Sequence, residues 1–177
     1  MPVTQAAIDA YTEPLIGHGL PSSSLPELVG AESITILHFL RHLGCLYCKD
    51  SVSQLKAFVD SVGRFPTIFF VHPSPLKAGD AFFAQYYPGA PHISDESLKL
   101  YNLFDIRRLN PVQFANPLQV AKGALAFLRG HRQVEVLGNE WVLTGTFLFY
   151  NGQLRWQHRG QYAGDNPDWR KLAVATA

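Results

Sequence analysis

The sequence predicts an α/β domain in which short buried strands alternate with helices. Two apolar segments rich in β-forming residues, 33–40 and 66–73, are typical of strands that are buried on both faces. A helical pattern follows each of them: apolar residues recur at steps of three and four over 48–62, and four aromatic residues line one side of 76–87. Strands and helices that alternate at this spacing form parallel strand pairs.

The elements outside this centre have weaker signals. Residues 1–30 form a lead-in, with a short helix expected in 6–15 and a connector rich in glycine, proline and serine after it. Residues 91–95 are expected to form a short strand that leads into a helix over 96–104. Ser94 and Asp95 are both suitable residues to cap that helix.

The last third of the chain contains an insertion and a hairpin. The insertion, 105–139, holds one well-marked helix that is expected to start at Asn116 and Pro117 and to stop at Gly130. The dipeptide Asn151-Gly152 separates two strand-like runs, which is a strong signal for a two-residue hairpin turn. A final short helix is expected from Asn166 onward.

Composition excludes several classes of function. With 177 residues the chain fits a single domain spanning 1–177, and its formal net charge is only +1. No block of like charges is present, which argues against nucleic-acid binding or a polybasic membrane patch. The N-terminus lacks the features of a secretory signal, and the apolar runs are too short to span a bilayer. We therefore expect a soluble protein in the cytoplasm.

The two cysteines of the chain, Cys45 and Cys48, lie three positions apart in the stretch LGCLYCK. They come directly after the first buried strand and occupy the first turn of the predicted helix. The unpaired N–H groups and the dipole at a helix N-terminus stabilise an anion, so a cysteine there has a lowered pKa. A second cysteine one turn away is able to attack its oxidised form. Charge from four neighbours would help if their side chains turn toward the sulfurs: His38, Arg41, His42 and Lys49.

Two other interpretations of the pair stay open. The cysteines could be small apolar residues of the core, brought together by chance. They could also be half of a zinc site completed by histidines, although no second C-x-x-C or H-x-x-x-H motif supplies the remaining ligands. Redox chemistry explains the position of the pair better than either.

Two segments, FLRHLGCLYCKDSVSQL and TGTFLFYNGQLRWQHRGQYAGDNPD, give the chain a family resemblance. It resembles the peroxiredoxin-like branch of the alkyl hydroperoxide reductase/thiol-specific antioxidant (AhpC/TSA) family. The resemblance implies a thioredoxin-like fold, with a central mixed sheet flanked by helices and a helical insertion before the C-terminal hairpin. It also implies a thiol-dependent peroxide reductase or dithiol–disulfide oxidoreductase that works without a metal or organic cofactor.

The two parent patterns disagree on which sulfur attacks. Typical peroxiredoxins carry P-x-x-x-T-x-x-C; with Cys48 placed last, Arg41 stands at the proline position and Cys45 at the threonine position. Aligned with thioredoxin, Cys45 is the exposed nucleophile and Cys48 the resolving thiol. The proline that thioredoxins place opposite the disulfide is replaced by Thr144. The start of the helix favours Cys45 and the peroxiredoxin pattern favours Cys48, so both are kept.

Five further residues are supporting candidates. Arg41 and Arg159 could hold a thiolate and polarise a peroxide bond, although each could also be a solvated surface arginine. Thr144 and Gly145 should face the cysteines in a thioredoxin-like fold, or could simply begin a strand. Tyr47, between the cysteines, is expected to shape access to the site. His38, within an apolar strand, is better explained as a core histidine than as a general base.

We therefore predict a peroxiredoxin-like enzyme that reduces peroxides through a Cys45–Cys48 dithiol cycling to a disulfide. An external dithiol donor, such as a thioredoxin or glutathione system, would restore the reduced form. One alternative is a thioredoxin-like disulfide reductase without peroxidase activity. Another is a non-catalytic binding or redox-sensing module. The 105–139 insertion could cover the active site or form the contact of a homodimer.

Overall fold

A six-stranded mixed sheet forms the centre of the protein, which we describe from a computed structural model. The described residues are 3–31, 34–62, 66–109, 117–133 and 141–169. The strand order across the sheet is β1-β4-β3-β2-β5-β6. The strands are β1 (Ile16–His18), β2 (Ile34–Phe39), β3 (Thr67–His72), β4 (His92–Ser94), β5 (Gly145–Tyr150) and β6 (Gln153–Arg159). The helices are α1 (Gln5–Asp9), α2 (Leu25–Gly30), α3 (Leu46–Val62), α4 (Leu76–Tyr86), α5 (Lys99–Leu103) and α6 (Pro117–Leu128).

The pairing of the strands confirms the predicted fold class. β2, β3 and β4 run parallel to one another, whereas β5 pairs antiparallel with β2 and β6 pairs antiparallel with β5. The β5–β6 hairpin turns at Asn151 and Gly152, whose φ angles of 49° and 76° give the two positive values that such a turn requires. The sheet therefore has a parallel centre and an antiparallel edge.

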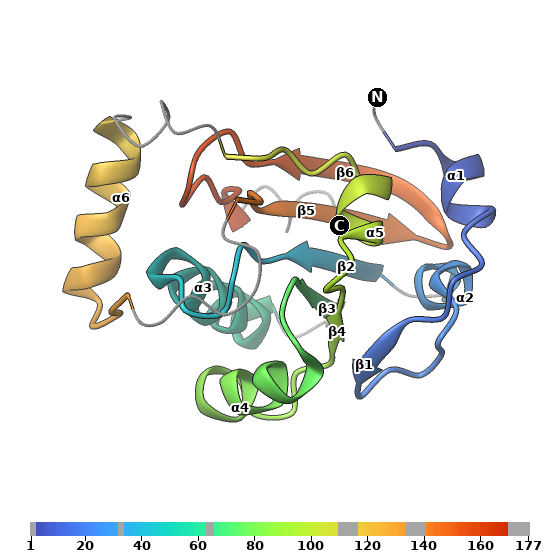
Figure 1. The fold of residues 1–177 in the computed structure, drawn as a ribbon, viewed down its shortest axis with the longest axis horizontal. Coiled ribbons are helices and arrows are strands. Elements are labelled where there is room, and N and C mark those ends of the chain that lie inside the picture. Colours follow the sequence, from blue (N-terminus) through green and yellow to red (C-terminus); the bar gives the residue numbers. More distant parts are fainter. Residues whose placement is uncertain (1–2, 32–33, 63–65, 110–116, 134–140, 170–177) are drawn as a thin grey trace.

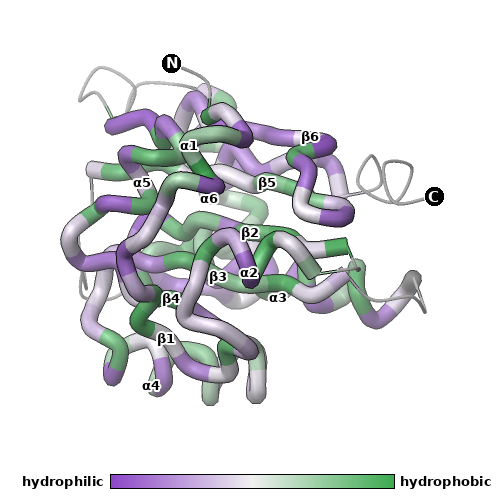
Figure 2. The backbone as a smooth tube through the Cα atoms, turned by 90° about the vertical axis from the view of Figure 1, so that its right-hand side faces the viewer, coloured by the Kyte–Doolittle hydropathy of each residue, from purple (hydrophilic) through white to green (hydrophobic). Residues whose placement is uncertain are grey.

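Helices cover both faces of this sheet and enclose two hydrophobic clusters. One face, with Phe39, Phe147 and Phe149, packs against α1, α2 and α5. The other face, with Ile36, Phe70 and Leu148, packs against α3 and α4 and includes both cysteines. Hydrophobic residues are concentrated along the central strands in Figure 2, as burial on two faces requires. In Figure 1, α6 stands at one end of the sheet, outside the two layers.

The N-terminal lead-in contributes more to the fold than its sequence predicted. The expected connector contains β1, which pairs antiparallel with β4 and completes one edge of the sheet. It also contains α2, which Ser24 caps by accepting from Glu27 N. A three-residue strand with one glycine carries no periodic signal, so only the pairing with β4 defines it.

Three predicted helices have other bounds in the structure. The first, α1, ends at Asp9, and α5 starts at Lys99 with Leu98 at its N-cap position instead of Ser94 or Asp95. The last helix begins at Trp169, and not at Asn166 and Pro167.

The Asp95 carboxylate accepts the backbone N–H groups of Lys99, Leu100 and Tyr101 and thereby caps the start of α5. Gly63, Asn116 and most of the predicted last helix lie outside the described residues. Among the helices of the described part, none has the length and apolar character needed to cross a membrane.

Candidate active site

The cysteine pair lies at the junction of β2 and α3. Cys45 directly precedes the helix, and its carbonyl oxygen accepts the N–H groups of Cys48 and Lys49 at 3.1 Å each. Cys45 is therefore the residue that caps the helix, and Cys48 lies in the first turn. Both cysteines are free and fully buried. The local geometry is thus the strand–helix junction that the sequence predicted.

Arg41 contacts both sulfur atoms of the pair. Its backbone N–H donates to Cys48 Sγ at 3.2 Å, and its guanidinium Nη1 donates to Cys45 Sγ at 3.4 Å. Arg41 Nε donates to the carbonyl oxygen of Val142 at 3.2 Å, which holds the side chain in this position. A permanent cation, itself buried, therefore faces the sulfur at the start of the helix.

The two thiols have opposite pKa shifts. Burial by itself would raise the pKa of Cys45, but hydrogen bonds from Cys48 and His42 and the charge of Arg41 hold it well below its usual range. Burial raises the pKa of Cys48 well above its usual value, and the neighbouring charge of Cys45 adds to this shift. Both shifts favour the thiolate form at Cys45 and the thiol form at Cys48. This electrostatic arrangement favours Cys45 over Cys48 as the attacking group.

The insertion covers the first turn of α3. The Tyr47 hydroxyl donates to the carbonyl oxygen of Gln119 on α6 at 2.9 Å. Lys49 Nζ donates to the carbonyl oxygen of Arg132 at 2.8 Å, and Leu46 N donates to Gln133 Oε1 at 3.2 Å. The residues that flank both cysteines are therefore bound to α6 or to the segment after it. Of the two roles left open for the insertion, the structure shows cover over the cysteine helix.

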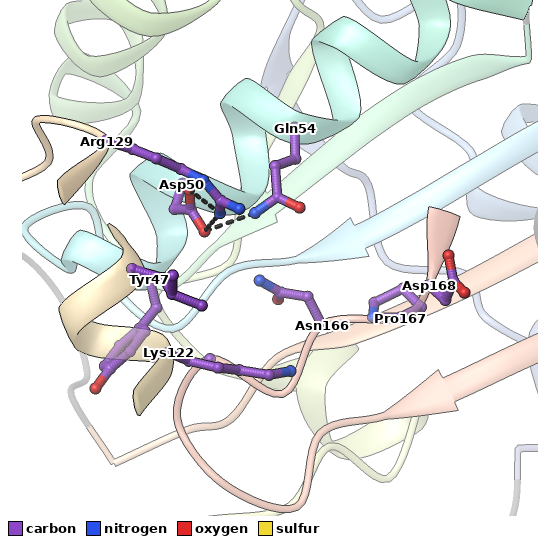
Figure 3. Close-up of a pocket in the computed structure, with 10 residues that line it drawn as sticks. Tyr47, Asp50, Gln54, Lys122, Arg129, Asn166, Pro167 and Asp168 are labelled. Atoms are coloured by element: carbon purple, nitrogen blue, oxygen red, sulfur yellow. Dashed lines mark hydrogen bonds and ion pairs between the residues drawn. The ribbon is translucent and has the colours of Figure 1, made fainter. Parts of the chain in front are cut away.

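A polar cavity of about 340 Å³ lies beside Tyr47, between α3, α6 and the segment after β6 (Figure 3). An ion pair between Arg129 Nη1 and Asp50 Oδ1, at 2.9 Å, forms one wall of the cavity and ties α6 to α3. Gln54 Nε2 donates to the same carboxylate at 2.6 Å. The remaining polar side chains that line the cavity are Lys122, Asn166 and Asp168. Tyr47, which lies between the two cysteines in sequence, thus lines this cavity.

The remaining candidates lie at different distances from the pair. The Thr144 hydroxyl donates to the carbonyl oxygen of Asp165, and Gly145 packs closely against Ile106. Both residues continue the segment whose Val142 carbonyl holds Arg41, so they are linked to the site through its backbone. That these two residues face the cysteines stays a prediction.

Arg159 is bound elsewhere in the structure. Its Nε donates to the carbonyl oxygen of Phe104 at 2.9 Å, and its guanidinium lies over the ring of Phe147. Both partners belong to the hydrophobic cluster on the face of the sheet away from the cysteines. The structure brings Arg41, and not Arg159, to the sulfur atoms.

His38 is a core histidine. Its Nδ1 hydrogen-bonds the hydroxyl of Thr146 at 2.9 Å and its Nε2 the hydroxyl of Ser51 at 2.7 Å. Burial, with a smaller effect from the charge of His158, lowers the pKa of His38 to about 3. The ring is therefore neutral at physiological pH and has no free nitrogen with which to act as a base.

The residues of the α6 contact were missed in the sequence. Gln119 and the Asp50–Arg129 pair looked like ordinary polar positions on two separate helices. The sequence carried no signal for this contact, because only the structure shows that Gln119 is buried while several large apolar side chains of α6 are exposed. Those exposed side chains are Leu118, Val120, Leu125, Phe127 and Leu128.

In the described part of the chain, no group of three or more histidine, cysteine or acidic side chains is placed to hold a metal ion.

The mixed sheet, with a C-x-x-C pair at a strand–helix junction, defines a thioredoxin-fold protein that carries a dithiol. The model of the AhpC/TSA antioxidant enzyme family matches residues 49–162, which is more than half of the chain. The protein belongs to this family. The matched segment begins immediately after Cys48, so the chemistry of the pair has to be argued from its own geometry.

Solved structures confirm the fold. A peroxiredoxin Q of Xanthomonas campestris, in a cysteine-to-serine mutant, is 22% identical with a TM-score of 0.58; the alignment covers 99% of this chain and 93% of that one. The bacterioferritin comigratory protein of the same organism, studied for its alkyl peroxide reduction activity, is 20% identical with a TM-score of 0.57, covering 99% and 93%. MTB dsbF is 13% identical with a TM-score of 0.52, covering 96% and 95%. The search of curated proteins found no match.

Proposed function

We propose that this AhpC/TSA-family enzyme reduces peroxides, with Cys45 as the attacking thiolate and Cys48 as the resolving thiol. The observation that carries the proposal is the contact of Arg41 Nη1 with Cys45 Sγ at 3.4 Å, beside a Cys48 thiol that donates to the same sulfur. A thiolate is the reactive form of cysteine, and the guanidinium is a suitable group to stabilise charge on a peroxide oxygen.

The reaction has three balanced steps. The Cys45 thiolate attacks one peroxide oxygen, the O–O bond breaks, and the leaving oxygen takes up a proton, which gives a Cys45 sulfenic acid and an alcohol or water. The Cys48 thiol then condenses with the sulfenic acid, releasing water and forming the Cys45–Cys48 disulfide. Two electrons and two protons from an external dithiol restore the starting form.

Similarity to other proteins supports the same chemistry. The bacterioferritin comigratory protein of Xanthomonas campestris is described by its alkyl peroxide reduction, and it shares the fold over nearly the whole chain. An alkyl hydroperoxide is accordingly the substrate class to test beside hydrogen peroxide. As reductant we propose a thioredoxin or glutathione system in a reducing compartment such as the cytoplasm. The predicted homodimer would use the exposed apolar side of α6.

The decisive measurement is the second-order rate at which the fully reduced protein loses thiols when mixed with hydrogen peroxide or tert-butyl hydroperoxide near neutral pH. A rate orders of magnitude above that of free cysteine supports a peroxidase. A rate equal to that of free cysteine with both peroxides would refute the proposal. The Cys45→Ser variant, in which the folded scaffold keeps the second thiol, is the matched control.

A disulfide reductase is the second candidate, and the C-x-x-C pair itself favours it. The first cysteine of such a pair, at the start of a helix and with a lowered pKa, is also the group that attacks a protein disulfide. MTB dsbF, solved in mixed oxidised and reduced forms, shares the fold of this chain. Reduction of insulin disulfides, with sluggish loss of thiols to both peroxides, would select this candidate.

A further inference from the structure

We propose that His42 is a catalytic residue of the peroxide reaction, donating the proton that the leaving oxygen takes up when Cys45 attacks. The inference rests on the proposed peroxidase function. In the pattern P-x-x-x-T-x-x-C, His42 stands at a position that the pattern does not specify.

The chemistry requires a proton donor at this place. When the O–O bond of hydrogen peroxide or an alkyl hydroperoxide breaks, the leaving group is hydroxide or alkoxide, both of which are strong bases. A positioned acid that delivers a proton in the transition state accelerates such a step by about 10²–10⁴-fold. Histidine is the side chain that most readily exchanges a proton between pH 5 and 8.

His42 lies against the reacting sulfur. Its carbonyl oxygen accepts the N–H of Cys45 at 3.1 Å, which fixes the loop between the two residues. Its side chain hydrogen-bonds the Cys45 thiol, and its charge helps to hold the pKa of that thiol low. The residue is only 3% exposed. Because a peroxide must bring one oxygen to this sulfur, the imidazole is the titratable side chain beside the position of attack.

The ring also has unused hydrogen-bonding capacity. Nδ1 of His42 is buried and has no hydrogen-bond partner among the described residues. A buried polar nitrogen without a partner is costly, so its retention indicates a function. A bound peroxide would supply the missing partner.

The other proton carriers around the pair are already engaged. The hydroxyl of Tyr47 donates to Gln119 O, and the hydroxyl of Tyr101 donates to the carbonyl oxygens of Leu40 and Val71. The ammonium of Lys49 donates to Arg132 O and lies over the ring of Tyr86. His38, as shown above, is neutral and bonded at both nitrogens.

Arg41 cannot take the place of His42. A guanidinium keeps its proton throughout the physiological pH range, so Arg41 stabilises charge without transferring a proton. Arg41 therefore holds the thiolate, and His42 delivers a proton to the leaving oxygen. The neutral imidazole recovers its proton from water after the alcohol has left.

Peroxides with different leaving groups test this role. Alkoxide from tert-butyl hydroperoxide needs a proton, whereas acetate from peracetic acid is a weak base and leaves without one. We expect His42→Asn and His42→Gln to slow the reaction with tert-butyl hydroperoxide by about 100-fold, within the range for general acids. The reaction with peracetic acid should change much less. Both rates are measured near neutral pH and divided by the ionised fraction of Cys45 in each variant, so that an altered thiol pKa does not contribute.

The matched control is His18→Asn, because His18 is exposed on β1 and pairs with Asp80. This control should leave both rates unchanged. Equal slowing of both peroxides in the His42 variants, or no slowing of either, would overturn the inference. An unreactive wild-type protein would instead overturn the proposed function. Fast reaction with peracetic acid shows that a variant is folded, and the Gln variant replaces the Asn variant if only one of them folds.

Discussion

Arg41 and Cys45 form the central contact of the site, with the guanidinium Nη1 3.4 Å from the sulfur. Both residues are buried, so the attraction between cation and thiolate is weakly screened by solvent. The same arginine binds Cys48 through its backbone N–H, which places the two sulfurs at one point of the fold. The reactivity of the pair depends on this contact.

Replacing Arg41 should therefore raise the pKa of Cys45 and slow its reactions at neutral pH. Loss of a buried cation next to a thiolate shifts its pKa by about one to three units. We expect Arg41→Met to lower the rate of Cys45 alkylation by iodoacetamide at pH 7 by about tenfold or more, with recovery at higher pH. Arg155→Met, at an exposed position on β6, is the control. An unchanged pH profile in Arg41→Met would show that the arginine does not hold the thiolate.

Replacing each cysteine should block a different step of the reaction. Cys45→Ser should lose the fast reaction with peroxide, because the remaining thiol has a raised pKa. Cys48→Ser should keep the first step and stop at a sulfenic acid, which dimedone traps and mass spectrometry detects. The reverse outcome, with a fast reaction in Cys45→Ser and none in Cys48→Ser, would make Cys48 the attacking thiol.

The stability of the fold should fall in acid because of two buried histidines. Burial, helped by neighbouring histidine charge, lowers the pKa of both His38 and His72 to about 3. The unfolded chain takes up protons at these positions below about pH 6.5, whereas the folded protein does not. The contribution of the two neutral histidines to the free energy of unfolding should therefore be complete above pH 6.5. It should decrease toward pH 3, by up to about 1.4 kcal/mol per pH unit for each histidine.

Urea unfolding between pH 3 and 7.5 measures this dependence. His38→Asn and His72→Asn should each flatten the slope, because each variant removes one of the two groups. A free energy of unfolding that is constant from pH 7 to pH 4 in the wild-type protein would contradict the assigned burial of both rings.

Gly164 should be required for the position of Tyr47. Its φ is +81°, and a Cβ atom there would lie 2.6 Å from Cδ1 of Tyr47. Gly89 has the same φ of +81° but open space around it. Alanine at Gly89 should thus cost only the backbone strain, about 1–2 kcal/mol. Alanine at Gly164 should cost a further ~1–3 kcal/mol from the overlap with the ring.

Thermal or urea unfolding of the two variants gives these costs. Because Tyr47 lines the polar cavity and lies between the two cysteines in sequence, Gly164→Ala should also change the rate of alkylation of Cys45, whereas Gly89→Ala should not. Equal destabilisation and equal alkylation rates in the two variants would mean that the Tyr47 ring moves aside without consequence.

The sequence alone determined the central part of the fold and the position of the pair. Strands β2 and β3, helices α3 and α4 and the Asn151-Gly152 hairpin carry strong local signals, because burial on two faces, helical periodicity and turn chemistry each restrict the residues allowed. The C-x-x-C motif indicated a redox pair on the same local grounds. It did not decide which sulfur attacks, since the two family patterns disagree.

Only the tertiary structure decided the contacts of that pair. Arg41 reaches Cys45 because Val142, about a hundred residues further along the chain, holds its side chain, and Arg159 is drawn instead to Phe104 on the other face of the sheet. Likewise β1 exists through its pairing with β4, and α6 covers Tyr47 through Gln119. Each of these contacts joins residues that are far apart in sequence, and such pairings leave no periodic or local pattern from which they could have been predicted.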